Sequence, residues 1–293
     1  GQVGCAGFNQ AGQCGNGGRV DVTGMPAAIA DFSQDVAQVS SLHQHMCAVL
    51  VDGSVECAGG NDHYQLGDGS TFSHSTPVSV SGLPNGVKAV KVFTGIFHSC
   101  AVLENGEMWC WGYNAHGAIG IASTSTAVTS PTKVTALPSG AEVVDATIGY
   151  HSIALLSDGR IFCWGHNSQG ECGAGHTNNV VGTAVEVDVG SSGTVVAVEG
   201  AGRHGTCALF NTGKRKCWGL NHVGQLGVDS SNQYIGDDSN EMGDNLPFFT
   251  SPNGDDYVYV TQGSGNHACG LTASGELWCG GYNPNGQLGT GDK

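Results

Sequence analysis

The twelve cysteines are the residues of this chain whose spacing most directly predicts chemistry. Eight of them form four pairs ten positions apart, across segments such as CAVLENGEMWC that have a glycine in the middle. A hairpin whose three-residue loop ends in glycine places the two cysteines of such a segment opposite each other, at the separation that a disulfide needs. We therefore predict four cross-strand disulfides: Cys47 with Cys57, Cys100 with Cys110, Cys207 with Cys217, and Cys269 with Cys279.

The other four cysteines compensate for missing partners. One unit has Ile153 where the first cysteine is expected, and in that unit Cys172 follows Cys163 by nine positions; the first unit likewise has Cys14 nine positions after Cys5. Units that keep the first cysteine have an aliphatic residue at the later position: Leu66, Ile119, Leu226 and Leu288. Reduced thiols that fill a core would not show this exchange. We expect six disulfides, each worth about 2 to 3 kcal/mol, an oxidising compartment and no free thiol nucleophile.

Other residues with chemical potential recur once in each unit. A ring of imidazoles could bind a metal ion, but a residue found at the same place in every unit more simply serves the unit, by hydrogen bonding a neighbouring turn. We predict this structural role for the recurrent histidines: His45, His98, His151, His204 and His267. We predict packing roles for the tryptophans: Trp109, Trp111, Trp164, Trp218 and Trp278. We predict turn-forming roles for the recurrent asparagines: Asn9, Asn61, Asn114, Asn167, Asn221 and Asn283. No metal ion and no cofactor are expected.

The elements that position these residues follow from a six-fold repeat. The phrases are CAGFNQAGQCG, CAGGNDHYQLG, CWGYNAHGAIG, CWGHNSQGECG, CWGLNHVGQLG and CGGYNPNGQLG, spaced by 52, 53, 53, 54 and 62 residues. A unit of this length with valine-rich runs between glycine-rich turns is typical of four short strands, as in Val87 to Val92, Ser99 to Leu103, Glu107 to Trp111 and Pro131 to Val134. Four-stranded sheets bury their faces by stacking on one another. We predict an all-β propeller with six or seven four-stranded blades.

Residues 1–293 are expected to form a single propeller domain that begins and ends inside a repeat unit. The closing blade would then be shared between the termini, completed by another molecule, or supplied by a longer parent chain. No run of 18 apolar residues predicts a transmembrane segment. The chain starts at Gly1 without an apolar leader, so a secreted protein would already have lost it.

The charge of the chain narrows the class of partner. Ten Lys and Arg against 25 Asp and Glu give a formal net charge of -15, which argues against binding to nucleic acid. The basic run Lys214 to Lys216 is interpreted as a solvated face. The longest interval contains an acidic insertion, GDDSNEMGDN at residues 236–245, and loops that outgrow their siblings often carry function. Its carboxylates do not match a calcium loop, which favours a solvated loop over a metal site. If the insertion binds a partner, the candidate binding residues are Asp237, Asp238, Glu241 and Asp244.

The segments HSCAVLENGEMWCWGYNAHG and RHGTCALFNTGKRKCWGLNHVGQLG resemble the regulator of chromosome condensation repeat family. The resemblance covers essentially the whole chain and implies a seven-bladed propeller that binds other macromolecules on a rim. The founding member promotes nucleotide exchange on a small nuclear GTPase, and no position here matches its working surface. Cysteine-paired versions of the repeat resemble secreted proteins of bacteria and protists, one of which inhibits β-lactamases.

Together these features favour a protein that is not an enzyme, since nucleophile-elbow, H-E-x-x-H, phosphate-loop and C-x-x-C patterns are all absent. The preferred hypothesis is an extracellular or cell-surface propeller that acts as a rigid protein-binding or assembly module. Its partners would be other proteins or copies of itself, in an array or filament. The alternatives are a secreted inhibitor or toxin-like binder and, less favoured, a guanine nucleotide exchange factor.

Overall fold

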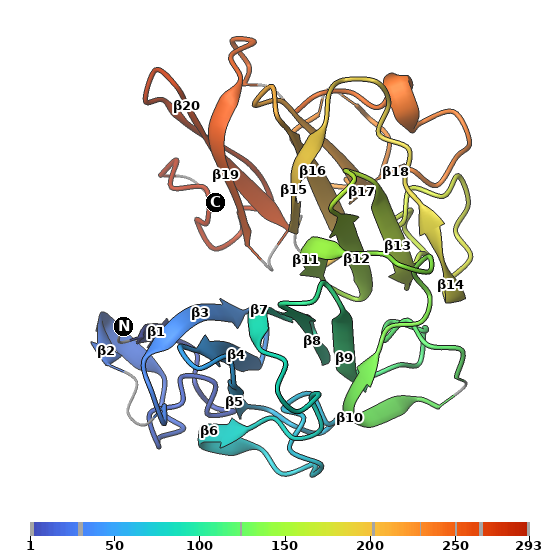
Figure 1. Ribbon diagram of the computed structural model, residues 1–293. Coiled ribbons are helices and arrows are strands. Elements are labelled where there is room, and N and C mark those ends of the chain that lie inside the picture. Colours follow the sequence, from blue (N-terminus) through green and yellow to red (C-terminus); the bar gives the residue numbers. More distant parts are fainter. Residues whose placement is uncertain are drawn as a thin grey trace. The chain divides into compact units, whose positions relative to one another are not determined.

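The computed structural model describes residues 3–28, 32–123, 125–200, 203–228, 230–249, 251–263 and 266–291. Its elements are β-strands and one short 3-10 helix (Figure 1). The chain divides into two compact units, residues 1–144 with 181–183 and residues 145–180 with 184–293. No helix in the described ranges has the length and hydrophobicity of a membrane span.

The first unit contains three antiparallel sheets. A two-stranded sheet pairs β1 (Gly4–Gly7) with β2 (Val22–Ala28). A four-stranded sheet has the order β3 (Val36–Ser41), β4 (His45–Leu50), β5 (Val55–Gly59) and β6 (His74–Ser79). The next has the order β7 (Ala89–Thr94), β8 (His98–Leu103), β9 (Met108–Tyr113) and β10 (Ala127–Lys133).

The remaining three sheets belong mainly to the second unit. The first has the order β11 (Val143–Ile148), β12 (His151–Leu156), β13 (Ile161–Gly165) and β14 (Val180–Glu186). The second has the order β15 (Val195–Gly200), β16 (Gly205–Phe210), β17 (Arg215–Leu220) and β18 (Tyr234–Ile235), and the 3-10 helix η1 (Gly243–Asn245) follows it in the chain. The third has the order β19 (Tyr257–Gly263), β20 (His267–Thr272) and β21 (Leu277–Gly281).

The predicted four-strand pattern is confirmed in the third repeat, with shifted boundaries. Strands β7, β8 and β9 lie within two residues of their predicted positions, whereas β10 begins at Ala127, four residues before the predicted start. A register shift between Val128 and Thr132 divides β10 into two paired segments, and the prediction located only the second. The hairpin between β8 and β9 has the expected loop, because Gly106 has a φ of 77° and its amide donates to the Leu103 carbonyl at 2.9 Å.

Successive sheets within a unit bury their faces against each other. In the first unit the core between sheets β3–β6 and β7–β10 contains Val49, Leu66, Val92 and Leu103 around the fully buried Trp111. The Trp111 indole donates to the Gln65 carbonyl of the preceding repeat at 3.0 Å. In the second unit the fully buried Trp218 donates in the same way to the Glu171 carbonyl at 2.9 Å. These two tryptophans therefore join neighbouring repeats, while Trp109 and Trp278 are only partly buried.

The recurrent asparagines organise the loop that follows the third strand. In each repeat the Asn side-chain oxygen accepts a hydrogen bond from the amide five residues later, as between Asn61 and Leu66 at 3.0 Å. The other acceptors of this kind are Asn9, Asn114, Asn167, Asn221 and Asn283. The Asn61 amide group also donates to the carbonyls of Ser70 and Phe72, which fixes the return of the chain to β6. The predicted turn-forming role of these residues is thus visible in their contacts.

Candidate functional site

All twelve cysteines form disulfides in the structure, with the partners that the spacing predicts. Four disulfides join residues that face each other across a hairpin, with Cα atoms 4.0 Å apart for Cys47 and Cys57 and 4.1 Å apart in the other three. The Cys5–Cys14 and Cys163–Cys172 disulfides instead join a strand to the following loop. Each of the six sheets therefore carries one covalent link.

The buried histidines bind the next repeat, which agrees with a structural role. The His45 Nε2 atom lies 2.9 Å from Ser99 Oγ, and Ser99 Oγ donates to the Gln65 carbonyl at 2.8 Å. Because the serine proton is used in that bond, His45 donates from Nε2. Its buried Nδ1 atom has no hydrogen-bond partner, which fits a neutral imidazole. His151 makes the equivalent contact with Thr206 Oγ1 at 2.8 Å.

One member of the predicted histidine set was placed wrongly. Relative to its cysteine, Gly205 occupies the position that His45 and His151 occupy in their repeats, and His204 lies one residue earlier, before β16 begins. Position 204 corresponds to Gln44 and Tyr150. The prediction treated the histidines as one set although the fifth repeat shifts its histidine by one residue, and this shift moves the side chain out of the buried row.

We expect His45 to make the stability of the fold depend on pH. Burial, followed by the charges of His98 and His43, lowers the pKa of His45 from 6.5 to about 3. Above pH 6.5 the imidazole is neutral in both states and this stability is fully present. As the pH falls from 6.5 towards 3, only the unfolded chain takes up the proton, so the free energy of unfolding decreases by about 1.4 kcal/mol per pH unit.

Denaturant unfolding at a series of pH values tests this expectation. Between about pH 6.5 and pH 4.5, the free energy of unfolding of His45→Gln should fall less steeply with decreasing pH, by the contribution of one proton. This change in slope is expected whatever the effect of the substitution on stability at neutral pH. The exposed His222 supplies the control, since His222→Gln should leave the slope unchanged. Equal slopes for the His45 variant and the native chain would contradict the assignment.

The basic run on β17 is not the solvated face that the sequence suggested. Only Lys214 is exposed, whereas the side chains of Arg215 and Lys216 are 3% and 1% exposed. Arg215 pairs with Glu199 at 3.1 Å and donates to the Tyr257 carbonyl at 2.7 Å. Lys216 donates to the carbonyls of Val189 and Gly243, both at 3.0 Å. The interpretation failed because residues 243–249 fold back over β17, and sequence spacing does not reveal that contact.

The acidic insertion at residues 236–245 is an ordered loop with assigned hydrogen bonds. Glu241 accepts from the amides of Gly236 at 2.8 Å and Asp238 at 3.3 Å. Asp244 accepts from the Ser191 amide at 2.8 Å and hydroxyl at 3.0 Å. Burial raises the pKa of Asp237, and the adjacent Glu241 acts in the same direction. The structure thus brings Asp237 and Glu241 together, directs Asp244 towards Ser191, and leaves Asp238 exposed.

Lys216 holds the acidic insertion through its bond to the Gly243 carbonyl. We expect that replacing Lys216 makes the backbone of the insertion more mobile. Lys216→Met keeps the aliphatic stem but removes the donor to two buried carbonyls, which should cost about 1 to 3 kcal/mol of unfolding free energy. Amide hydrogen exchange in residues 236–245 should accelerate at the same time. Lys214→Met is the matched control, because Lys214 is exposed and lies over the same Phe248 ring. Unchanged exchange in the Lys216 variant would show that the loop does not depend on this anchor.

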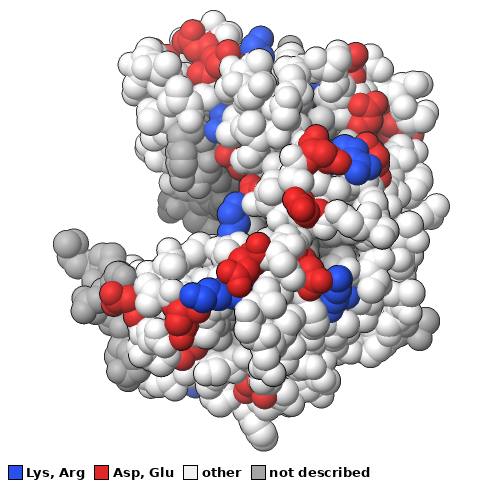
Figure 2. Space-filling view, in the orientation of Figure 1, with Lys and Arg blue, Asp and Glu red and all other residues white. Residues whose placement is uncertain are grey.

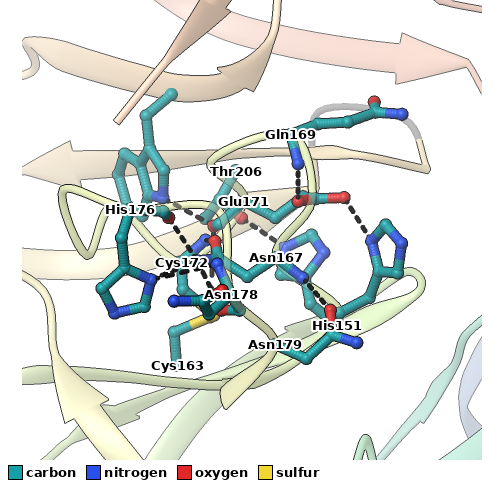
Figure 3. The surroundings of a disulfide bond; sticks show 12 residues. His151, Cys163, Asn167, Gln169, Glu171, Cys172, His176, Asn178, Asn179 and Thr206 are labelled. Carbon is teal, nitrogen blue, oxygen red and sulfur yellow. Dashed lines mark hydrogen bonds and ion pairs between the residues drawn. A yellow bond between two sulfur atoms is a disulfide. The ribbon is translucent and has the colours of Figure 1, made fainter. Parts of the chain in front are cut away.

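A second cluster lies where the fourth and fifth repeats meet, and the sequence did not predict it. The Nδ1 atoms of His166 and His204 each lie 2.7 Å from the same Oε1 atom of Glu171. The other carboxylate oxygen, Oε2, accepts from the Gln169 amide at 2.8 Å, in the loop closed by the Cys163–Cys172 disulfide (Figure 3). The Glu171 side chain is fully buried, while His166 and His204 are 16% and 18% exposed.

The electrostatics of this cluster favour an ionised carboxylate. Burial opposes ionisation of Glu171, but the hydrogen bonds from His166 and His204 outweigh it and hold the pKa of the carboxyl well below its usual range. Burial lowers the pKa of the neighbouring His151 to about 4, although the Glu171 charge acts in the opposite direction. Within the described residues, His166, Glu171 and His204 are the one group of three or more His, Cys, Asp or Glu side chains that could hold a metal ion.

A signal for this cluster exists in the repeat. The third-strand phrase ends in GQCG, YQLG, GAIG or GQLG in five copies but in GECG in the fourth, which places Glu171 where Gln13, Gln65 and Gln225 stand. The compensating cysteines of the copies do not reveal this exchange of glutamine for glutamate. Figure 2 shows acidic side chains at several separate places on the visible face.

The regulator of chromosome condensation (RCC1) repeat matches this chain through two family models. One matches residues 52–102 and 105–156, and the other matches residues 89–118 and 149–171. The matched segments contain the Cys100–Cys110 hairpin disulfide and also His166 and Glu171.

Curated relatives align with much of the chain. The ultraviolet-B receptor UVR8 of Arabidopsis thaliana is 26% identical over 288 residues, which are 98% of this chain and 62% of the receptor. The probable E3 ubiquitin-protein ligase HERC6 of Homo sapiens is 28% identical over 257 residues, which are 87% of this chain and 24% of that protein. The chain therefore spans less than two thirds of either relative.

Solved structures share the fold at lower identity. Human WBSCR16 matches with a TM-score of 0.76 and 23% identity, over 97% of this chain and 72% of that one. Yeast RCC1 (Prp20), in its complex with Kap60, matches with a TM-score of 0.75 and 21% identity, over 96% and 64%. The ectodomain of the Physcomitrella patens receptor kinase CR4 matches with a TM-score of 0.50 and 21% identity, over 88% and 54%. The predicted β-propeller fold is confirmed by these similarities.

Proposed function

Because this chain belongs to the regulator of chromosome condensation repeat family, whose β-propellers bind proteins, we propose that it is a disulfide-stabilised binding module without catalytic activity. The observation that carries the proposal is the ordered acidic insertion. Glu241, Asp244 and Lys216 fix its backbone from within the second unit, so the loop keeps its conformation without a partner. A loop that is ordered in advance loses little conformational entropy on binding. The exposed carboxylate of Asp238 and the half-buried carboxylate of Asp237 suit a protein partner with a basic surface.

The proposed location is outside the cell or at its surface. Six disulfides in one chain are stable in an oxidising compartment and are rare in a reducing one. The same fold occurs in the CR4 ectodomain, which supports an extracellular setting for such a propeller. We further propose that residues 1–293 form one propeller domain. Alkylation of producer cells with a membrane-permeant thiol reagent, followed by mass spectrometry, should find no free cysteine; twelve modified cysteines would contradict the location.

Cross-linking of the disulfide-intact chain to proteins of its own extracellular environment tests the binding surface. Combined Asp237→Asn and Asp238→Asn should abolish the cross-linked partner, and its recovery from the native chain should fall as salt rises. Combined Asp255→Asn and Asp256→Asn is the matched control, since these are also two adjacent aspartates and both are exposed. A partner retained equally by both double variants would contradict the role of the insertion. A hydrolase among the partners would instead favour an inhibitor, and a small GTPase an exchange factor.

A specific observation also favours self-assembly as a second function. Strand β21 pairs only with β20 in the described part of the chain, whereas the third strand of each four-stranded sheet pairs on both sides. The edge of β21 carries Leu277, which is 68% exposed. Such an edge can pair with a strand of another copy. Light scattering should then find oligomers that Leu277→Lys dissociates; a monomer at all concentrations would exclude this function.

A further inference from the structure

Three residues that lie together in the fold differ in type from the residues at the equivalent positions of other repeats. Glu171 stands where other repeats have glutamine, His166 corresponds to Tyr113 and Leu220, and His204 corresponds to Gln44 and Tyr150. The three residues come from three segments: the end of β13, the loop after it, and the residues just before β16. The repeat itself does not need them, because the other copies fold without them.

Four of the other five repeats carry glutamine at the position of Glu171. In those repeats the side-chain oxygen accepts from the amide two residues earlier, at 2.9 Å for Gln65 and 3.0 Å for Gln225. Glu171 keeps this contact through Oε2 and the Gln169 amide. Its additional oxygen, Oε1, is therefore free to serve another purpose, and both histidines converge on that atom.

We propose that His166, Glu171 and His204 bind a divalent transition-metal ion of the zinc type. Two imidazole nitrogens and one carboxylate oxygen are a donor set that Zn²⁺ uses when a fourth position is left to water or another ligand. The three donor atoms all lie within 4.8 Å of one another. Ligands of a tetrahedral zinc ion lie about 3.3 Å apart. Binding therefore requires each imidazole Nδ1 atom, now 2.7 Å from Oε1, to move about half an ångström away from that oxygen, and the two Nδ1 atoms to move closer to each other.

The surroundings of the three side chains resemble those of metal ligands. Gln169 fixes the carboxylate, Ser168 Oγ lies 3.1 Å from His166 Nε2, and the Tyr150 ring stacks on His204 with centroids 4.8 Å apart. Such contacts to the far side of each ligand set its orientation. The partial exposure of both imidazoles leaves a path for the ion and its water.

The charge of the site also suits a dication. With both imidazoles neutral, the three side chains carry a single negative charge on a fully buried carboxylate. An ion at this place would compensate that charge and would link β13 to the segment that precedes β16, thereby clamping two neighbouring sheets. Nitrogen donors favour zinc-type ions over Ca²⁺ and Mg²⁺, which prefer oxygen ligands.

Titration with Zn²⁺ alone tests the proposal on the full, disulfide-intact chain, purified without a polyhistidine tag and stripped with a chelator. Calorimetry should show one ion per chain. Glu171→Gln and His204→Gln restore residues that other repeats carry at these positions, so both variants should fold, and each should weaken binding by at least about tenfold to a hundredfold. The control variant His222→Asn should bind like the native chain, because His222 is exposed and outside the cluster.

Co²⁺ provides a second readout that is independent of affinity. The native chain should give the visible absorption of a tetrahedral Co²⁺ site, and Glu171→Gln should abolish it while leaving the circular dichroism spectrum unchanged. Absence of Zn²⁺ binding by the native chain would overturn the proposal. So would binding that both variants retain in full, since the ion would then occupy other ligands. Neither result would bear on the acidic insertion as a protein-binding surface.

Discussion

Reduction of the disulfides should unfold the chain under otherwise native conditions. Each disulfide closes a loop of nine or ten residues, and such a loop contributes about 2 to 3 kcal/mol by restricting the unfolded state. The six together contribute about 12 to 18 kcal/mol, which is at least comparable to the net stability of about 5 to 15 kcal/mol that is typical of folded domains. Circular dichroism and tryptophan fluorescence against increasing reductant should therefore show loss of the sheets as free thiols appear.

A relocated disulfide provides the matched control for this prediction. Cys172→Leu alone should cost about 2 to 3 kcal/mol, because it leaves Cys163 unpaired. Adding Ile153→Cys should restore most of the loss, since Ile153 faces Cys163 directly in the register of β12 and β13. A fully reduced chain that kept cooperative unfolding would contradict the prediction and would also weaken the case for an oxidising compartment.

The disulfides could be predicted from the sequence because a hairpin turn determines which residues face each other. Once Gly106 ends the loop, Cys100 and Cys110 must be neighbours, and the same local rule applies to every copy. The strand pattern followed from similar local signals. Its errors occurred where pairing is irregular, as at the register shift that divides β10.

The site residues were harder to predict because their contacts join segments distant in sequence. Glu171 and His204 are 33 positions apart, and only the packing of neighbouring sheets brings them together. Lys216 reaches Gly243 in the same way, which buries a charge that the sequence alone assigns to a solvated face. Comparison of the six copies position by position would have marked Glu171 and His166 as exceptions, but it would not have shown that they meet.

Gly59→Ala should be strongly damaging to the scaffold, with a cost of about 3 to 5 kcal/mol. Gly59 has a φ of 114°, which residues with a side chain rarely adopt. A Cβ at this position would lie 2.7 Å from the Cα of His45 and would collide with the Gln44 carbonyl oxygen. That oxygen accepts the Gly60 amide at 2.7 Å, so the clash would also break the approach of β4 and β5.

A second glycine separates the clash from the backbone strain. Gly69 also has a positive φ, of 84°, but an added Cβ would meet nothing within 4 Å. Gly69→Ala should therefore cost only the strain of the left-handed conformation, about 1 to 2 kcal/mol. Denaturant unfolding of both variants measures the difference, which isolates the contribution of close backbone contact between β4 and β5. Equal losses in the two variants would mean that the hairpin relaxes around the new methyl group, and that the recurrent glycine serves the φ angle alone.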